Sequence, residues 1–241
     1  MVMRVEISIE SVAGARIAAK AGAARVELCA GLSDGGLTPS VALIEAASAL
    51  VEVHALVRPR PGGFCYSRDE LDLMIRDIAV ARAHGAAGVV IGALTEDGRI
   101  DDACAEFVAA AGSMQTTFHR AIDTTADSRV ALDRLLDMGF TRVLTSGRRR
   151  SAVDGAPLIK DLVAQAGDRL EVMVGGGVRS TNAAQIIATT GVGDLHAAPR
   201  RPVGTATGGE VSYAGVSVPA GHDYFETDPD EVAALCAFQT A

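Results

Sequence analysis

Glycines recur along this chain at a nearly constant interval, and this spacing constrains the fold more than any other feature. Gly85, Gly112, Gly139, Gly167 and Gly191 lie 27, 27, 28 and 24 residues apart, and each follows a helical pattern and precedes an apolar segment. A glycine just past a helix end adopts the left-handed cap conformation without steric cost. The repeat therefore predicts a series of evenly spaced helix-to-strand junctions.

The same interval extends toward the N-terminus. Gly22 has an equivalent setting, and 27 residues further on lies Ala49, where the glycine is missing. With an opening strand, the pattern predicts strands near Val5, Val26, Val53, Val89, Thr117, Val143, Val172 and Leu195. The segments between them predict helices over residues 11–21, 39–49, 68–84, 101–111, 128–138, 156–166 and 180–190.

Eight strand–helix units in 241 residues are typical of a (β/α)8 TIM barrel. The alternative is a doubly wound open sheet, which usually has fewer units and an early G-x-G-x-x-G fingerprint that this chain lacks. We predict a single α/β domain over residues 1–241 with an irregular last unit. Residues 228–240 predict a C-terminal helix, with Asp228 at its N-cap position.

Residues 197–227 precede that helix and are rich in Gly, Pro and Thr, which predicts a long loop. Tyr213, Tyr224 and Phe225 place several of the few aromatic residues in it. Because aromatic side chains are favoured at contact surfaces, we expect a partner subunit to order this segment, or the segment to cover the barrel mouth. A mobile excursion without a role is the alternative.

Composition excludes several classes of protein. A net charge of −8 argues against nucleic acid or an anionic membrane as a partner. The early charges of the N-terminal segment argue against a signal peptide, and no apolar run approaches the roughly 20 residues that span a bilayer. The cysteines lie far apart and form no C-x-x-C pair, which favours reduced thiols over disulfides. They are Cys29, Cys65, Cys104 and Cys236. We expect a cytoplasmic protein.

One strand carries unusual polar side chains. In residues 24–40, Val26 and Leu28 alternate with Arg25, Glu27 and Cys29. Successive side chains of a strand point to opposite faces, so a carboxylate and a thiol share the face opposite the apolar one. A glycine-rich loop and a helix start follow, and this strand–loop–helix arrangement is a usual location for a site in α/β proteins.

Barrel enzymes place their chemistry at the C-terminal ends of the strands. Four titratable residues are expected there and are candidates for acid–base catalysis: Glu6, Glu27, His119 and Asp123. The alternative is structural: the carboxylates would pair with arginines, and His119 would be a satisfied packing residue. The sequence leaves both interpretations open.

A small anionic ligand is a further expectation. Arg58 and Arg60 flank a proline, and their planar guanidinium groups suit a carboxylate or phosphate. The alternative is that they brace the loop through Asp69 or Glu70. Other candidate ligand-binding residues at the strand ends are Arg120, Thr145, Ser146, Gly175, Gly176 and Gly177, the glycines offering backbone N–H groups.

Five segments in this order resemble the CutC family, which is named for copper homeostasis: RVELCAGLSDGGLTPS, VRPRPGGFCYSRDEL, TFHRAID, RVLTSG and GGGVRSTN. The resemblance covers about residues 6–197. It implies a (β/α)8 barrel, a cytoplasmic protein that functions in copper tolerance, and a homodimer or higher homo-oligomer. It also implies Cu(I) binding at cysteines on the first two strands.

Cys29 matches the second cysteine of that copper site, whereas the family motif E-V-C is Glu6-Ile7-Ser8 in this chain. A serine hydroxyl replaces a thiolate poorly as a Cu(I) ligand, so we expect weak Cu(I) binding. Cys65 is a second thiol that could approach from the loop after the third strand. The family's serines after the eighth-strand histidine are also missing, since Ala197 and Ala198 follow His196.

Two functions from different classes remain open. The resemblance and Cys29 favour a copper-handling protein of copper homeostasis. The cluster of Glu, Arg and His side chains favours an enzyme that acts on a small anionic or sugar-like substrate by acid–base chemistry.

Overall fold

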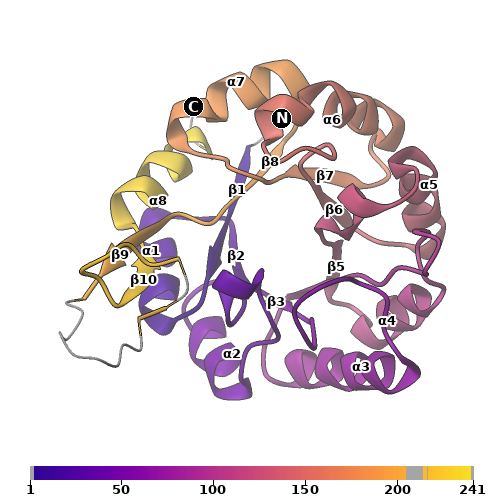
Figure 1. Ribbon diagram of the computed structural model, residues 1–241, viewed down its shortest axis with the longest axis horizontal. Coiled ribbons are helices and arrows are strands. Elements are labelled where there is room, and N and C mark those ends of the chain that lie inside the picture. The colour runs from indigo at the N-terminus through magenta and orange to yellow at the C-terminus, as the bar shows by residue number, and fades with distance from the viewer. Residues whose placement is uncertain (1–2, 205–213, 216, 240–241) are drawn as a thin grey trace.

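The computed structural model describes residues 3–204, 214–215 and 217–239. Eight parallel strands close into a barrel in sequence order, and helices surround it (Figure 1). The predicted (β/α)8 TIM barrel is confirmed.

The barrel strands are short and regular: β1 (Arg4–Ile9), β2 (Arg25–Leu28), β3 (Val53–Leu56), β4 (Gly88–Ile91), β5 (Gln115–Phe118), β6 (Arg142–Thr145), β7 (Glu171–Val174) and β8 (Asp194–Ala197). The helices that follow them are α1 (Val12–Ala21), α2 (Val41–Ser48), α3 (Arg68–Ala83), α4 (Ala103–Ala111), α5 (Ser128–Met138), α6 (Ala152–Ala166) and α7 (Ser180–Thr190). Two short 3-10 helices, η1 (Leu32–Asp34) and η2 (Arg120–Thr124), follow β2 and β5.

The junction glycines have the positive φ that the repeat predicts, although Gly112 and Gly167, with ψ −114° and −136°, lie outside the left-handed helical region. All six have a positive φ, between 54° and 95°. At the position without a glycine, α2 ends instead on a right-handed residue, Ala49, with φ −72°. Helix α6 begins at Ala152, four residues before the predicted start. The Ser151 hydroxyl accepts a hydrogen bond from the Asp154 amide and caps this earlier start.

The alternation in β2 separates an apolar layer from a polar barrel interior. Val26 and Leu28 are fully buried in the core between the barrel and its helices. β1 and β2 pair with Glu6 opposite Arg25 and Ser8 opposite Glu27. Glu27 therefore faces the barrel interior, as the alternation predicts.

The segment after β8 differs from the expected loop. Its two ends pair as an antiparallel ladder of β9 (Arg200–Val203) and β10 (Tyr224–Thr227) beside α1 (Figure 1). The Arg200 guanidinium lies 4.9 Å from the Phe225 ring centroid, which ties the ladder together. Residues 205–213 and 216, and with them Tyr213, lie outside the described residues.

The expected C-terminal helix is present as α8 (Pro229–Cys236), followed by the 3-10 helix η3 (Ala237–Gln239). The Asp228 carboxylate accepts hydrogen bonds from the Asp230 and Glu231 amides and so forms the N-cap. None of the helices in the described part of the chain is both long enough and apolar enough to cross a membrane.

Candidate functional site

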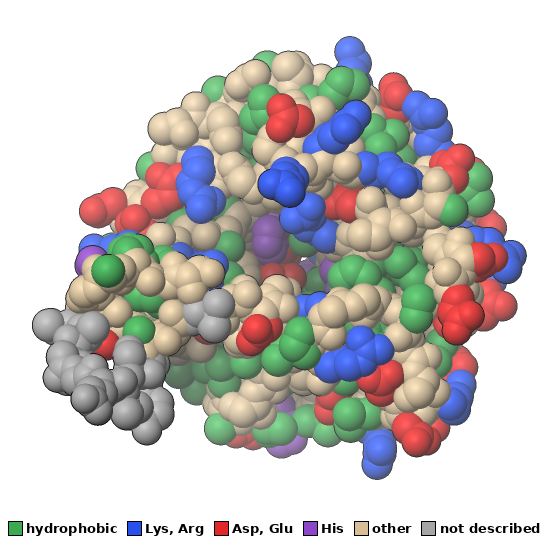
Figure 2. Space-filling model, in the orientation of Figure 1, with side chains coloured by type: hydrophobic (Ala, Val, Ile, Leu, Met, Phe, Trp, Pro, Cys, Tyr) green, Lys and Arg blue, Asp and Glu red, His purple; other side chains and the backbone are tan. Residues whose placement is uncertain are grey.

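A small cavity opens at the C-terminal ends of the strands. It has a volume of about 280 Å³, and Figure 2 shows the central hollow with histidine and acidic side chains inside it and basic side chains around it. Its walls combine polar and apolar side chains: Ser8, Glu27, Leu32, Gly35, Gly36, Leu56, Arg58, Phe64, His119, Arg120, Leu144, His196 and Ala198. The position agrees with the usual site of chemistry in this fold.

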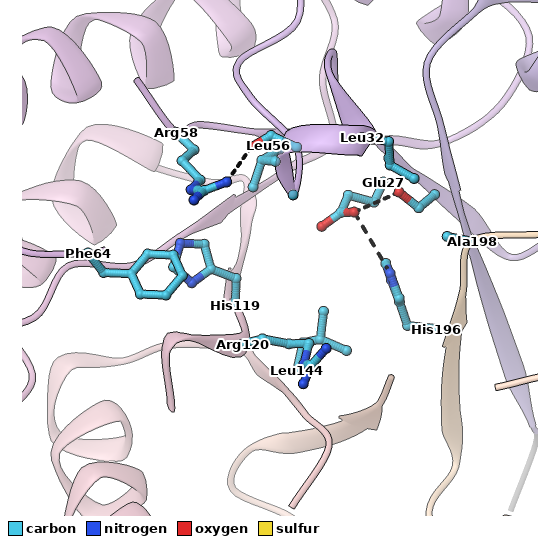
Figure 3. A pocket seen from close by; sticks show the side chains of 13 residues that line it. Glu27, Leu32, Leu56, Arg58, Phe64, His119, Arg120, Leu144, His196 and Ala198 are labelled. Atoms are coloured by element: carbon cyan, nitrogen blue, oxygen red, sulfur yellow. Dashed lines mark hydrogen bonds and ion pairs between the residues drawn. The ribbon is translucent and has the colours of Figure 1, made fainter. Parts of the chain in front are cut away.

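Glu27 and His196 meet on one wall of the cavity (Figure 3). Glu27 Oε2 lies 3.8 Å from His196 Nε2 and accepts a hydrogen bond from the Ser8 hydroxyl at 2.9 Å. His196 Nδ1 lies 2.8 Å from Glu6 Oε1, which is completely buried. A carboxylate thus orients the imidazole, and the imidazole contacts a second carboxylate that lines the cavity.

The proton affinities of these three groups differ strongly. Burial raises the pKa of Glu27. Burial acts to lower the pKa of His196, but the carboxylates of Glu27 and Glu6 outweigh it and the pKa is raised. Burial acts to raise the pKa of Glu6, but Arg25 and His196 outweigh it and hold that pKa far below its ordinary range. Glu6 therefore stays ionised, while Glu27 and His196 are the pair that can exchange a proton.

Neighbouring strands position this group. β1 and β8 pair with Glu6 opposite His196, which puts both side chains on the inner face at the same height. Gly175 at the end of β7 makes room for the imidazole, because a Cβ at that position would lie 3.2 Å from His196 Cδ2 and 2.8 Å from Leu144 Cδ1. One role of the glycine run is therefore to accommodate His196.

Buried charges form the floor beneath Glu6. Arg25 donates to Glu6 Oε2 at 2.6 Å and to Asp194 Oδ1 at 2.7 Å, and Asp194 also accepts from Arg4 at 2.6 Å. His196, Arg25 and Asp194 are not among the site residues that the sequence motifs predict. The signal that could have identified them is the alternation itself, since each lies two residues from another inward polar position in its own strand.

His119 lies on the wall opposite Glu27 and is 6% exposed (Figure 3). Its Nδ1 accepts a hydrogen bond from the Ala121 amide at 3.2 Å, and its ring packs 4.7 Å from the Phe64 ring. Gly92 makes room for it, since a Cβ there would lie 2.7 Å from His119 Cε1. Burial, followed by the charge of Arg58, lowers the pKa of His119 to about 3.

The two loop arginines have different positions. Arg58 lines the cavity, and its Nη1 and Nη2 donate to the carbonyls of Gly36 at 2.9 Å and Gly62 at 2.8 Å. Arg60 lies away from the cavity lining, where Nε donates to Glu70 at 2.5 Å and Nη2 donates to the Cys65 carbonyl at 2.7 Å. Arg60 thus has the loop-bracing position considered as the alternative, because its donors are committed to its own loop.

Asp123 organises the loop after β6 and does not line the cavity. Its carboxylate accepts hydrogen bonds from the Thr145 hydroxyl at 2.6 Å and from Arg120 Nε at 2.9 Å. It also accepts hydrogen bonds from the amide and the hydroxyl of Ser146. These donors occupy both carboxylate oxygens, and the side chain is not among those that line the cavity. The hydroxyls of Thr145 and Ser146 donate hydrogen bonds to Asp123 and do not line the cavity. Among Asp123 and its partners, Arg120 is the residue that lines the cavity.

The expected anion site at the glycine run has an internal carboxylate nearby. Glu231 of α8 accepts from the amide and the hydroxyl of Ser180, at 2.7 and 2.8 Å, at the start of α7. An acidic side chain at a helix N-terminus occupies the place where an anionic ligand would otherwise bind. Of the residues expected to hold this anion, Arg58 lines the cavity, whereas Arg60, Gly175, Gly176 and Gly177 are not among its lining residues.

Cys29 is fully buried beside Leu56 and Val90. Its sulfur lies 3.9 Å from the Ser8 hydroxyl and donates to the Ile9 carbonyl at 3.6 Å. Burial raises the pKa of this thiol well above its ordinary value. These residues do not fit a Cu(I) site, because Cu(I) prefers thiolates and the neighbour of this protonated thiol is a hydroxyl. Nor do the described residues contain a group of three or more His, Cys, Asp or Glu side chains that could hold a metal ion.

Comparisons with known proteins agree with this fold. The family protein CutC of Pasteurella multocida is 45% identical over 197 residues, which cover 80% of this chain and 81% of that protein. The human copper homeostasis protein cutC homolog is 44% identical over 198 residues, which cover 81% of this chain and 72% of the human protein. The crystal structure of CutC from Streptococcus agalactiae has a TM-score of 0.77 at 34% identity, covering 81% of this chain and 98% of that one. Thiamine phosphate pyrophosphorylase from Pyrococcus furiosus, at 13% identity and TM-score 0.60, shares the fold alone. The model of the CutC family matches residues 3–200, and this chain belongs to the CutC family.

Proposed function

We propose that this CutC-family protein is an enzyme that transfers protons on a small metabolite at the mouth of its barrel. The observation that carries the proposal is the position of Glu27. Its Oε2 is held by Ser8 and His196, whereas its Oε1 has no hydrogen-bond partner among the described residues and the carboxylate faces the cavity (Figure 3). A carboxylate held by one oxygen and presented by the other is suited to be a general base.

The neighbours of Glu27 support this role. A raised pKa makes a carboxylate a stronger base, and a raised pKa keeps His196 able to supply a proton near neutrality. Because the two groups lie 3.8 Å apart, the charge of each affects the pKa of the other, and their titrations are coupled. Glu6 is a positioning residue in this scheme, since it fixes the His196 ring and does not line the cavity.

The cavity limits the substrate. A volume of about 280 Å³ admits only a small molecule, and Leu32, Leu56 and Leu144 give it apolar walls. Arg120 at the cavity, with its side chain 43% exposed, favours a negative or strongly polar group at the mouth. We therefore propose a small anionic or sugar-like substrate.

Incubation with the low-molecular-weight fraction of a cell extract, followed by mass spectrometry, tests this function without a known substrate. We expect the protein to deplete one compound while a product accumulates. Glu27→Gln should slow this conversion by about 100-fold or more, the typical contribution of a positioned acid or base. The matched control Glu106→Gln alters an exposed carboxylate on α4 that pairs with Arg68, and should keep the wild-type rate.

Equal conversion by the wild type and Glu27→Gln, or no conversion by either, would show that this proposal is wrong.

The names of the relatives associate the family with copper homeostasis, and for this chain we propose at most weak binding of Cu(I), through Cys29. We also propose a cytoplasmic homo-oligomer. The widely spaced free cysteines support reduced thiols. The net charge of −8 does not favour binding to nucleic acid or to an anionic membrane.

A further inference from the structure

Two polar groups of side chains that line the cavity are buried without a hydrogen-bond partner in the described part of the protein. They are Nε of Arg58 and Nε2 of His119. Arg58 and His119 are each 6% exposed, and both line the cavity. Because buried donors in folded proteins are nearly always paired, this cluster indicates a place where a further acceptor belongs.

The hydrogen-bond geometry determines what His119 offers. Its Nδ1 accepts from the Ala121 amide, so the proton of the neutral ring must be on Nε2. The lowered pKa keeps the ring neutral at physiological pH. His119 therefore presents a neutral N–H donor that is fixed in one tautomer.

Arg58 adds a positive charge that no side-chain carboxylate in its contacts compensates. Its hydrogen bonds go to the backbone carbonyls of Asp34, Gly36 and Gly62, and Nε is left over. The guanidinium and the His119 ring share one neighbour, the Phe64 ring, at 5.3 and 4.7 Å. Phe64 thus packs against both donor side chains, and all three residues line the cavity.

The two walls of the cavity have complementary chemistry. In Figure 3, Arg58, Phe64 and His119 lie on one side of the open space, and Glu27 and His196 lie on the other. One wall offers a cation and a neutral donor, which suit an oxygen that gains negative charge. The facing wall offers a base. A carboxylate base opposite a neutral histidine is an arrangement suited to enolisation.

We propose that Arg58 and His119 bind the carbonyl oxygen of a small 2-oxo or α-hydroxycarbonyl compound, while Glu27 removes a proton from its neighbouring carbon. This inference rests on the proposed function and specifies its reaction class. The Glu27 carboxylate forms an O–H bond as the C–H bond breaks. The C–H electron pair becomes the C=C bond of an enolate, which is an enediolate where the neighbouring carbon carries a hydroxyl, and the carbonyl π pair moves to the oxygen. Return of the proton to carbon completes a step that needs no oxidant or reductant.

Proton exchange in D2O tests the reaction class. Pyruvate, hydroxyacetone and glyceraldehyde are incubated with the protein, and proton NMR follows the loss of their α-proton signals. We expect at least one probe to exchange faster than in buffer and Glu27→Gln to abolish this. His119→Phe should slow the exchange about tenfold or more, because it keeps the ring packing on Phe64 and removes the donor. His84→Phe, on an exposed histidine at the end of α3, is the matched control and should exchange normally.

Binding of oxalate, a planar mimic of an enolate, provides a second measurement. In protein labelled with ¹⁵N-histidine, oxalate should shift the His119 Nε2 resonance, and its Kd should rise about tenfold in His119→Phe. Equal exchange by the wild type and His119→Phe, with loss only in Glu27→Gln, would overturn this inference and leave the proposed function standing. Absence of probe exchange together with an unmoved His119 resonance would show that the donors hold only a water molecule, and would also overturn it.

Discussion

At the scale of single residues, Ser8 determines how the site can function. Its hydroxyl donates to Glu27 and lies 3.9 Å from the Cys29 sulfur. Because a hydroxyl is a hard, weakly acidic ligand, this residue holds the candidate base and leaves the only thiol at this position without a soft partner. One side chain thus supports the acid–base interpretation and weakens the copper interpretation.

Substitution of this residue tests the copper interpretation directly. Ser8→Cys should tighten Cu(I) binding by about tenfold or more, because it restores a second soft ligand beside Cys29. A competition titration against a Cu(I) chelator under reducing conditions measures the change. The comparison is made in a Cys65→Ala background, since Cys65 is an exposed thiol that could bind Cu(I) by itself. Tight one-to-one binding by the unaltered protein that is lost in Cys29→Ala would contradict this expectation.

At the scale of elements, the last helix completes the barrel by a polar contact as well as by packing. Val232 and Leu235 of α8 are fully buried, and Glu231 places its carboxylate at the start of α7. This contact satisfies the Ser180 amide, which has no acceptor within its own helix. The irregular last unit is therefore joined to the regular ones by a side-chain cap from a different helix.

Removal of this cap should destabilise the protein without affecting the cavity. Glu231→Ala is expected to lower the free energy of unfolding by about 1–2 kcal/mol, because it leaves the first turn of α7 without an acceptor and without a favourable charge. Urea denaturation followed by circular dichroism measures the loss. Asp230→Ala, in the same turn of α8 but without a contact to α7 among the described residues, is the control and should change stability less. An unchanged midpoint in Glu231→Ala would show that water replaces the carboxylate fully.

At the scale of the whole molecule, ionisable groups fill much of the barrel interior. Arg25, Glu6 and Asp194 form a chain of buried pairs below the cavity, and His119 and His54 lie inside the barrel as well. Breaking a buried pair by removal of one partner typically costs about 3–5 kcal/mol, so this floor resists substitution. The stability of the fold must consequently depend on pH.

The contribution of His119 to that dependence has a definite sign. Its pKa is about 3 in the folded protein and has an ordinary value of 6.5, so between these values this group binds more protons in the unfolded chain. His119 should therefore make stability rise with pH from about 3 to 6.5, and this contribution is lost as the pH falls through the window. Glu6, with its lowered pKa, acts in the same direction at the acid end, because its stabilisation is present above its unfolded pKa and lost below it. Glu27 and His196, whose pKa values are raised, act in the opposite direction.

Thermal denaturation between pH 4 and 8 separates these contributions. His119→Phe should flatten the rise in stability between pH 4 and 6.5, because it removes the group whose pKa is lowered. A His119→Phe profile as steep as that of the wild type would mean that His119 is accessible to protons in the folded state.

Local signals account for what the sequence determined by itself. The spaced glycines predicted the junctions because a positive φ after a helix is a requirement of a single residue and its neighbours. The alternation in β2 predicted that Glu27 faces inward, because a pleated strand has a period of two residues. The barrel fold and the inward-facing side chains of its second strand could thus be predicted without tertiary information.

Only the tertiary structure decided which side chains meet. Glu6 and His196 are 190 positions apart and come into contact because β8 closes the barrel against β1, a pairing that no local pattern specifies. Arg60 and Asp123 have the residue types expected of ligand contacts, yet partners within the fold, among them Glu70 of α3 and Thr145 of β6, occupy their hydrogen-bonding groups. Residue type and strand position predict which groups are available, but closure of the barrel determines which of them remain available to a substrate, because partners within the fold compete for the same hydrogen bonds.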